Sequence, residues 1–466
     1  MSITREIYKE RFWKVVLTFL FLLLSIALIV TWSAPATGYE SSIYCSTPLI
    51  LWLILIPSMA VGITLVIILI AQGESNKTVF RSIGVLLVLL GYTICLSLFI
   101  IRGYYMWRMP GDPAIHIGWI KETLSTGQTP ASLVYPMMHI YLSEFVLIPG
   151  LDLVFLHKIV PLIFSVLFVM FMYIFAKTLF AKSSVWLLVA LICCCPVYSW
   201  YLQLTPNVLA NFFLPIVLYL LYTYIQKRSL TWAIPLITVL LLMPLFHALP
   251  TMILVVVFFT LTISVVSSEI SMKKLRNLTS TDYTIIWPVF IILIWWIFWM
   301  SLFTLFDQQI HSIYETIVLE QDSSWLRDLA DKASYADSHG YNVIEQVVRQ
   351  LWGQILLLLM SALSLPLIIN RRLHGHNWRY VISISLALTI TIFSSIFFYL
   401  FNLAFTPQRF LFVISLFGTI FTAYLLSYLL TSVEKILKSL KSYIYSTVVI
   451  FFIFCLFVGG LFALYP

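Results

Sequence analysis

The chain of 466 residues is strongly apolar: 61% of its residues are hydrophobic, 10% are charged, and its mean hydropathy is +1.01. This composition excludes a soluble protein and predicts an all-α, polytopic integral membrane protein whose helices are the apolar runs. The formal net charge of +8 belongs to the short connections between these runs, so it gives no support for nucleic-acid binding.

Apolar runs of about 17 to 25 residues are long enough to cross a bilayer as helices, and the sequence contains about thirteen of them. The first run follows Arg5, Lys9, Arg11 and Lys14 and lacks a clear small-residue cleavage site, so we expect a retained span and not a removed signal peptide. The predicted spans are 13–31, 47–71, 83–101, 158–176, 185–202, 208–225, 232–246, 248–268, 284–305, 350–369, 380–401, 410–430 and 443–464.

The distribution of Lys and Arg predicts a cytoplasmic N-terminus, because positively charged loops are retained on the cytoplasmic side. With this orientation 19 of the 27 basic residues lie inside, whereas 13 of the 19 acidic residues lie outside. The glycosylation sequons at Asn76 and Asn277 then face the cytoplasm and should be unmodified. We therefore expect a multi-pass protein of the plasma membrane.

Two predicted outer connections, 102–157 and 306–349, are much longer than the others, and loops of this length usually have a function. In the second one, an apolar stripe from Trp325 to Ala330 predicts an amphipathic helix that lies on the membrane or over a cavity. We treat residues 1–466 as a single membrane domain, with two extra N-terminal spans in 1–82, a core in 83–305 and C-terminal spans in 350–466.

The connection 102–157 begins with a short predicted helix. In GDPAIHIGWIKETLSTG, Asp112 can cap the helix N-terminus, Pro113 suits its first position and Gly127 suits its C-terminal end. Positions four residues apart lie on the same helical face, so we expect Asp112 and His116 to point the same way.

A second helix is predicted to begin near Pro136, in YPMMHIYLSEF. It places Tyr135, His139 and Glu144 in the same compartment as the first helix. Acids, imidazoles and a phenol then converge at the outer membrane border, and ionisable groups in such apolar surroundings indicate a functional site.

The six cysteines predict neither a disulfide nor a metal site. Only Cys45 approaches the outer surface, and the others lie in predicted spans, where a thiol behaves as a small buried hydrophobic group. Cys193, Cys194 and Cys195 point in different directions around a helix, and Cys and His do not occur at metal-ligand spacing.

Four strings resemble a known family: GDPAIH, YPMMH, QLTPNVLANFFLP and PLFHALP. They are similar to segments of the GT-C glycosyltransferases, above all to the archaeal and bacterial membrane proteins related to dolichyl-phosphate-mannose protein mannosyltransferases. The resemblance covers about residues 83 to 260, and TPQRF around Arg409 matches later in the chain. The spans in 1–82 are additional to the family pattern.

The resemblance implies a GT-C-like fold with amphipathic helices in the first outer loop. It also implies an inverting enzyme that moves a sugar from a polyprenyl-phosphate (dolichyl-phosphate-type) donor to a protein, a lipid-linked glycan or a surface polymer on the outer face. Many members carry two adjacent acids in this loop, whereas here Pro113 follows Asp112. We therefore expect chemistry that uses one carboxylate. The sequence predicts no metal-ligating residues, although a divalent cation is possible as a cofactor.

Such a transfer needs a base for the acceptor hydroxyl and donors that hold the departing phosphate. Asp112 is the candidate base, and His116, one turn further on, could orient it or contact the phosphate. Arg409 is the strongest candidate for phosphate binding, because its guanidinium offers a fork of donors. Arg102 and Lys121 are alternatives for that role, and Tyr135, His139, Gln203 and His247 are candidates for substrate binding. Helix capping, interfacial anchoring and snorkelling are the structural alternatives for these side chains.

Two other classes of function stay open. A secondary transporter or lipid flippase should show charged or broken helices at mid-membrane and matched halves, neither of which is found in the sequence. A polysaccharide polymerase or ligase also uses a lipid-linked donor, but its long loop usually lies in the second half of the chain. An ATP-driven transporter is disfavoured because the phosphate-binding Gly-rich motif is missing.

Overall fold

The computed structural model describes residues 2–38, 40, 42–72, 78–105, 112–196, 202–271, 286–318, 330, 331, 334, 335, 337, 338, 340, 342–369, 378–400, 410–436 and 440–464. The predictions for Arg409, for Asn76 and Asn277, and for the stripe from Trp325 to Leu329 lie outside these residues.

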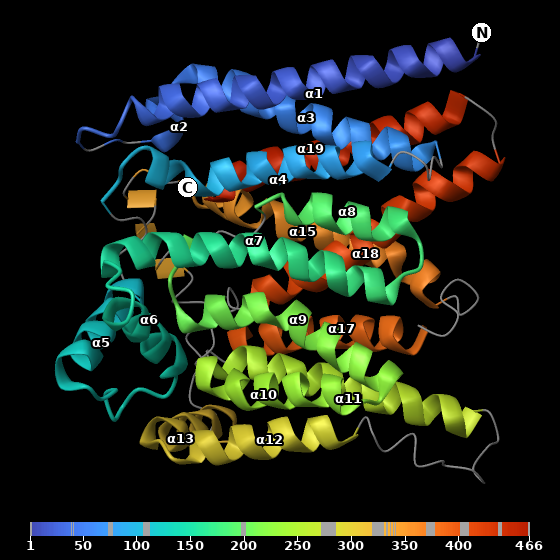
Figure 1. The fold of residues 1–466 in the computed structure, drawn as a ribbon. Coiled ribbons are helices and arrows are strands. Elements are labelled where there is room, and N and C mark those ends of the chain that lie inside the picture. The colour runs from blue at the N-terminus through green and yellow to red at the C-terminus, as the bar shows by residue number, and fades with distance from the viewer. Residues whose placement is uncertain are drawn as a thin grey trace.

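Helices are the regular structure of the described residues, and most of them run side by side along one direction (Figure 1). Each predicted span overlaps one helix of the bundle. These helices are α1 (Ser2–Trp32), α3 (Leu49–Ala71), α4 (Thr78–Ile101), α7 (Leu153–Leu179), α8 (Ser183–Cys193), α9 (Pro206–Lys227), α10 (Leu230–Phe246), α11 (Ala248–Ser271), α12 (Ile286–Ser301), α15 (Val343–Ile369), α17 (Trp378–Leu400), α18 (Leu411–Ile436) and α19 (Leu440–Leu464).

Within the part of the chain that the structure describes, eight helices are long and apolar enough to cross a membrane. The apolar stretches of α8, α10, α11, α12 and α17 are shorter. The structure therefore confirms an all-α, polytopic membrane protein, whereas the number of thirteen spans stays a prediction.

Two helices end earlier than the predicted spans. α8 stops at Cys193, whereas the apolar run continues to residue 202. Pro196 explains the difference, because proline disfavours helical geometry in the residue before it and cannot donate to the helical ladder. α12 stops at Ser301, and a separate helix, α13 (Thr304–Val318), follows it.

Two glycines allow α3 and α4 to pack closely. A Cβ atom on Gly62 would lie 2.9 Å from the backbone oxygen of Gly84, and one on Gly84 would lie 2.7 Å from a methyl group of Val66. Both separations are too short for a carbon contact. Close approach of backbones at small residues is a usual source of helix association in membranes, where burial of apolar surface contributes little.

The centre of the bundle is filled by aromatic side chains from α7, α9 and α18. The rings of Phe168, Phe212 and Phe412 lie with centroids 5.2 to 5.8 Å apart, and each side chain is almost completely buried. Tilted and edge-to-face ring pairs at such distances contribute beyond their buried area. This contact fixes α9, which also supplies part of the site described below.

Short helices gather at one end of the bundle (Figure 1, left). They are α2 (Ile43–Ser46), α5 (Asp112–Thr126), α6 (Met137–Leu147) and α13. α5 packs on α6 as a hairpin-like pair, and the predicted helix beginning near Pro136 is α6. The polar residues singled out in the sequence therefore gather beside the ends of the long helices.

Candidate functional site

A cavity of about 220 Å³ lies between α5 and the beginnings of α9 and α11. Segments far apart in the sequence build its wall. The polar and aromatic residues that line it are Asp112, His116, Trp119, Ser132, Tyr135, Gln203, Thr205, Asn207 and His247. Of the predicted site residues, five share this cavity: Asp112, His116, Tyr135, Gln203 and His247.

The local sequence of α5 sets the direction of Asp112 and His116. Pro113, Ile117 and Ile120 are buried, and their spacing gives one apolar face that packs on α6. Asp112 lies in the first turn of the helix, where a carboxylate is favoured by the helix dipole. The helix ends at Thr126 and is followed by Gly127, whose φ is +71°, a conformation that suits glycine after a helix. Asp112 and His116 consequently face the cavity together.

His116 and His139 form a contact that sets the protonation of both rings. Nδ1 of His116 lies 3.0 Å from Nε2 of His139, and Nδ1 of His139 lies 3.1 Å from the carbonyl oxygen of Tyr135. A carbonyl only accepts, so Nδ1–H of His139 donates to it and Nε2 is left as an acceptor. His116 then donates from Nδ1. In a neutral His116 ring, Nε2 therefore carries the lone pair.

The surroundings of His139 keep its ring uncharged. The side chain is completely buried between Trp119 and His116, with ring centroids 5.6 and 5.1 Å away. Burial lowers the pKa of His139 to about 4, against the smaller opposing effect of its hydrogen bond with the Tyr135 carbonyl. His139 thus serves as a neutral acceptor at physiological pH and lies behind His116.

His247 occupies the single position between α10 and α11. Its Nδ1 accepts a hydrogen bond of 3.2 Å from the backbone N–H of Leu249, and its backbone oxygen accepts one of 2.9 Å from the hydroxyl of Thr251. The ring stacks on Tyr135 with centroids 4.5 Å apart. Because Nδ1 accepts, the proton of the neutral ring is on Nε2, which makes this atom a donor.

The beginning of α9 forms another part of the wall. Thr205 caps the helix: its hydroxyl oxygen accepts from the backbone N–H of Val208 at 3.4 Å. Pro206 occupies the first helical position, as is common in helices. Gln203 is half-buried and Asn207 is buried. The cap and the proline therefore account for the direction in which the string QLTPN enters the helix.

α12 and α13 close one side of the cavity. Trp299 donates from Nε1 to the carbonyl oxygen of Val134 at 2.9 Å, and a separate apolar cluster of Val134, Ala248 and Met300 lies behind this bond. Leu305 at the start of α13 lines the cavity. Sequence reasoning missed Trp299 and Leu305, because nothing local links them to residues more than a hundred positions earlier.

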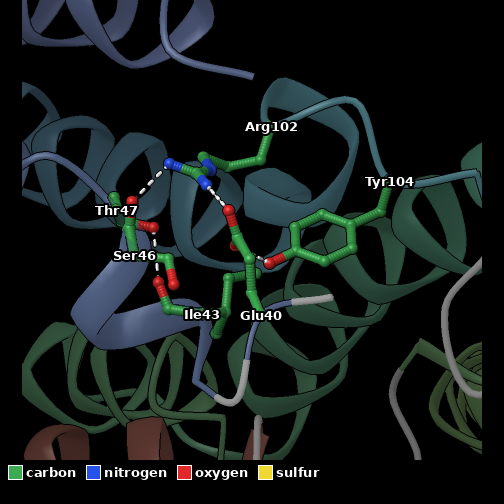
Figure 2. Close-up of polar contacts among 6 residues, drawn as sticks. All are labelled: Glu40, Ile43, Ser46, Thr47, Arg102 and Tyr104. Carbon is green, nitrogen blue, oxygen red and sulfur yellow. Dashed lines mark hydrogen bonds and ion pairs between the residues drawn. The ribbon is translucent and has the colours of Figure 1, made fainter. Parts of the chain in front are cut away.

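Arg102 belongs to a different polar cluster, shown in Figure 2. Its guanidinium forms an ion pair with Glu40 and donates to the carbonyl oxygen of Ser46, and the hydroxyl of Tyr104 donates to Glu40. Burial and the neighbouring Glu40 carboxylate raise the pKa of Tyr104 to about 12. Arg102 thus fastens the connection between α1 and α3 to the end of α4 and does not line the cavity.

The other predicted residues lie elsewhere. Lys121 on α5 and Glu144 on α6 are exposed and do not line the cavity, and His139 reaches it only through His116. Arg409 is outside the described residues. Among the described residues that line the cavity there is therefore neither Lys nor Arg, and the groups available to an anion there are neutral donors.

The donor set of the cavity does not fit a protein-held divalent cation well. Asp112 is the single carboxylate among the described lining residues, whereas Mg²⁺ and similar ions bind through several oxygens. In the described part of the chain, three or more His, Cys, Asp or Glu side chains do not come together in a geometry that would hold a metal.

Comparison with known proteins supports the fold. No protein-family model and no curated protein matches the chain. The structure is similar to the crystal structure of the Archaeoglobus fulgidus oligosaccharyltransferase, which was tethered with an acceptor peptide containing the NVT sequon. The two chains are 12% identical, with a TM-score of 0.50 over 84% of this chain and 56% of that one. The chain thus spans little more than half the length of that protein, and the likeness confirms a GT-C-like, all-helical membrane fold.

Proposed function

We propose that the protein is a membrane glycosyltransferase that moves a sugar from a polyprenyl-phosphate donor to an acceptor on the extracytoplasmic face. The observation that carries this proposal is the cavity in which Asp112, His116, Tyr135 and His247 meet, at the end of a bundle with the fold of an oligosaccharyltransferase. The mannosyltransferase-like strings of the sequence support a lipid-phosphate donor. The distribution of Lys and Arg supports the outer face.

In the proposed reaction, the hydroxyl oxygen of the acceptor attacks the anomeric carbon of the sugar. The bond from that carbon to the phosphate oxygen breaks, its electron pair leaves with the phosphate, and the carboxylate of Asp112 receives the hydroxyl proton. Attack opposite the phosphate inverts the anomeric configuration. Because phosphate is a good leaving group, one carboxylate is sufficient for this step.

His116 is proposed to orient the acceptor hydroxyl beside Asp112. Its Nδ1 is occupied by His139, which limits rotation of the ring and sets the tautomer. Nε2 can then accept a hydrogen bond from a hydroxyl group. Tyr135 and Gln203 line the same cavity and are proposed to contact the sugar. The acceptor remains one of the three classes named above: a protein, a lipid-linked glycan or a surface polymer.

A transfer assay in membranes tests the proposal. Radiolabelled polyprenyl-phosphate sugars are supplied to membranes containing the wild type or Asp112→Asn, and label is followed into proteins, lipid-linked glycans and polymer. We expect the substitution to abolish most of the transfer. Asp152→Asn is the matched control, because Asp152 caps α7 through a bond of 2.8 Å to Phe155 N–H and asparagine caps equally well.

Two results would contradict the proposal. Full transfer by Asp112→Asn at equal expression would remove Asp112 as the base. Movement of the labelled lipid across the bilayer without transfer of its sugar, in wild-type membranes, would favour a flippase instead.

A further inference from the structure

We propose that the first turn of α9, with Asn207 at its centre, binds the phosphate of the lipid donor. This inference rests on the proposed function and deepens it, since it names the site for the leaving group. The sequence had offered Arg409 for phosphate binding, with Arg102 and Lys121 as alternatives.

The main observation is an amide donor that the protein leaves without a partner. Asn207 is 6% exposed and lines the cavity. Its side-chain oxygen accepts from Nδ2 of Asn211 at 3.4 Å, whereas its own Nδ2 has no hydrogen-bond partner. Buried donors without a partner are costly and uncommon in proteins. Their presence in the wall of a cavity indicates that a bound ligand supplies the missing acceptor.

The position of Asn207 in the helix favours an anion as this ligand. It is the second residue of α9, so its backbone N–H has no acceptor within the helix. A helix of this length carries a positive partial charge at its N-terminus, and phosphate groups bind there. A sugar hydroxyl would satisfy the amide but would gain little from the dipole.

A neighbouring group on this wall is a donor too. The hydroxyl oxygen of Thr205 accepts from Val208 N–H, which leaves its proton for a ligand. The carboxylate of Asp112 comes from α5, a different element of the wall. Two kinds of group thus lie on separate elements: a base on α5, and donors for phosphate oxygens at the beginning of α9.

Binding measurements on the purified full-length protein test this assignment. The probes are farnesyl phosphate, farnesol and inorganic phosphate, and the readout is the dissociation constant. We expect the wild type to bind farnesyl phosphate at least about 10-fold more tightly than farnesol, because the phosphate gains charge-assisted hydrogen bonds. A free-phosphate site would bind inorganic phosphate as tightly as farnesyl phosphate, which would overturn the assignment to a lipid.

Substitutions at Asn207 separate phosphate from hydroxyl binding. Asn207→Ala should weaken farnesyl phosphate binding about 10-fold and leave farnesol binding unchanged. Asn207→Asp should weaken it further, because a carboxylate repels phosphate while it would still accept from a sugar hydroxyl. Asn342→Asp is the matched control: Asn342 caps α15 through a bond of 3.1 Å to Glu345 N–H, and aspartate caps equally well.

Unchanged farnesol binding shows that each variant is folded. If Asn207→Ala does not fold, Asn207→Ser is measured in its place. Equal binding of farnesyl phosphate by the wild type and Asn207→Asp would overturn the inference. If Asn207→Asp binds farnesyl phosphate as well as Asn207→Ala does, the amide does not contact phosphate, which also overturns it. If the phosphate preference depends on Asn207 but no sugar is ever transferred, the phosphate site stands and the proposed function fails.

Discussion

The two polar clusters of this protein lie close to the same end of the bundle but differ in how their charges are used. In the Arg102 cluster, guanidinium, carboxylate and phenol contact one another, and the side chain of Arg102 is 3% exposed. In the cavity, the carboxylate of Asp112 is exposed and neither Lys nor Arg is among the described lining residues. The comparison teaches that ionisable residues at one end of the bundle can serve two purposes: the Arg102 cluster holds chain segments together, whereas Asp112 and His116 line a cavity.

Neutralising Asp112, the acid of the cavity, should have the largest effect on the rate of sugar transfer. Asp112→Asn should lower the rate of sugar transfer by about 100- to 10,000-fold, the usual contribution of a general base. The temperature of unfolding should not change, because the side chain is exposed and asparagine also suits a helix N-terminus. Rates in membranes and thermal unfolding of the purified protein give the two readouts. A large loss of stability would make Asp112 a structural residue like Arg102.

Removing Arg102, the cation of the other cluster, should lower the stability of the protein and leave its transfer rate unchanged. Arg102→Ala removes the cation from the half-buried carboxylate of Glu40, to which the Tyr104 hydroxyl also donates, and should destabilise the protein by about 3 kcal/mol. The transfer rate of the molecules that remain folded should be unchanged at low temperature. The double variant Arg102→Met, Glu40→Met should recover much of the stability. If Arg102→Ala instead lowers transfer without lowering stability, Arg102 contacts substrate.

Lowering the pH should destabilise the folded protein through protonation of His139. Its pKa of about 4 in the folded protein is below the ordinary value of about 6.5, so the unfolded chain binds the proton more readily. The stabilisation is complete above about pH 6.5 and is lost as the pH falls toward 4, by roughly 3 kcal/mol in total. His139→Phe should unfold with a weaker pH dependence in this window. An unchanged slope would show that His139 is not the group responsible.

The smallest expected effect concerns the bond that closes the side of the cavity. Trp299→Phe removes the donor to the Val134 carbonyl and should cost about 1 kcal/mol of stability. We expect a few-fold higher KM for the donor and an unchanged kcat, since Trp299 is placed outside the reacting groups. Steady-state kinetics separate the two constants. A fall in kcat alone would indicate that Trp299 acts in the chemical step.

A structural feature could be predicted from the sequence when residues close together in the chain determine it. The ends of α5 were predicted to within one residue, because Asp112, Pro113 and Gly127 act within one turn; the helix begins at Asp112 itself, which had been expected to cap it. The apolar runs predicted the helical membrane fold for the same local reason, although the end of α8 was missed because the run stays apolar beyond Pro196. Boundaries of this kind depend on backbone geometry and not on hydrophobicity.

The contacts within the site could not be predicted in this way. His116 pairs with His139 only because α5 packs on α6, and Arg102 meets Glu40 across 62 positions of sequence. A short sequence motif does not state which side chain will satisfy another. The sequence therefore placed Asp112 and His116 on one helical face but did not name their partners, and it offered Arg102 as an alternative phosphate ligand, whereas the structure pairs Arg102 with Glu40.

The direct passage from α10 to α11 through His247 limits how this cavity can change. One residue joins two helices that each run along the bundle, and its ring and its backbone oxygen are both held by the first residues of α11. Inserting a residue here would rotate or shift at least one whole helix, whereas the connection between α5 and α6 can change length at the surface. New substrate preferences should therefore arise from the α5–α6 connection, while the wall at His247 keeps its position.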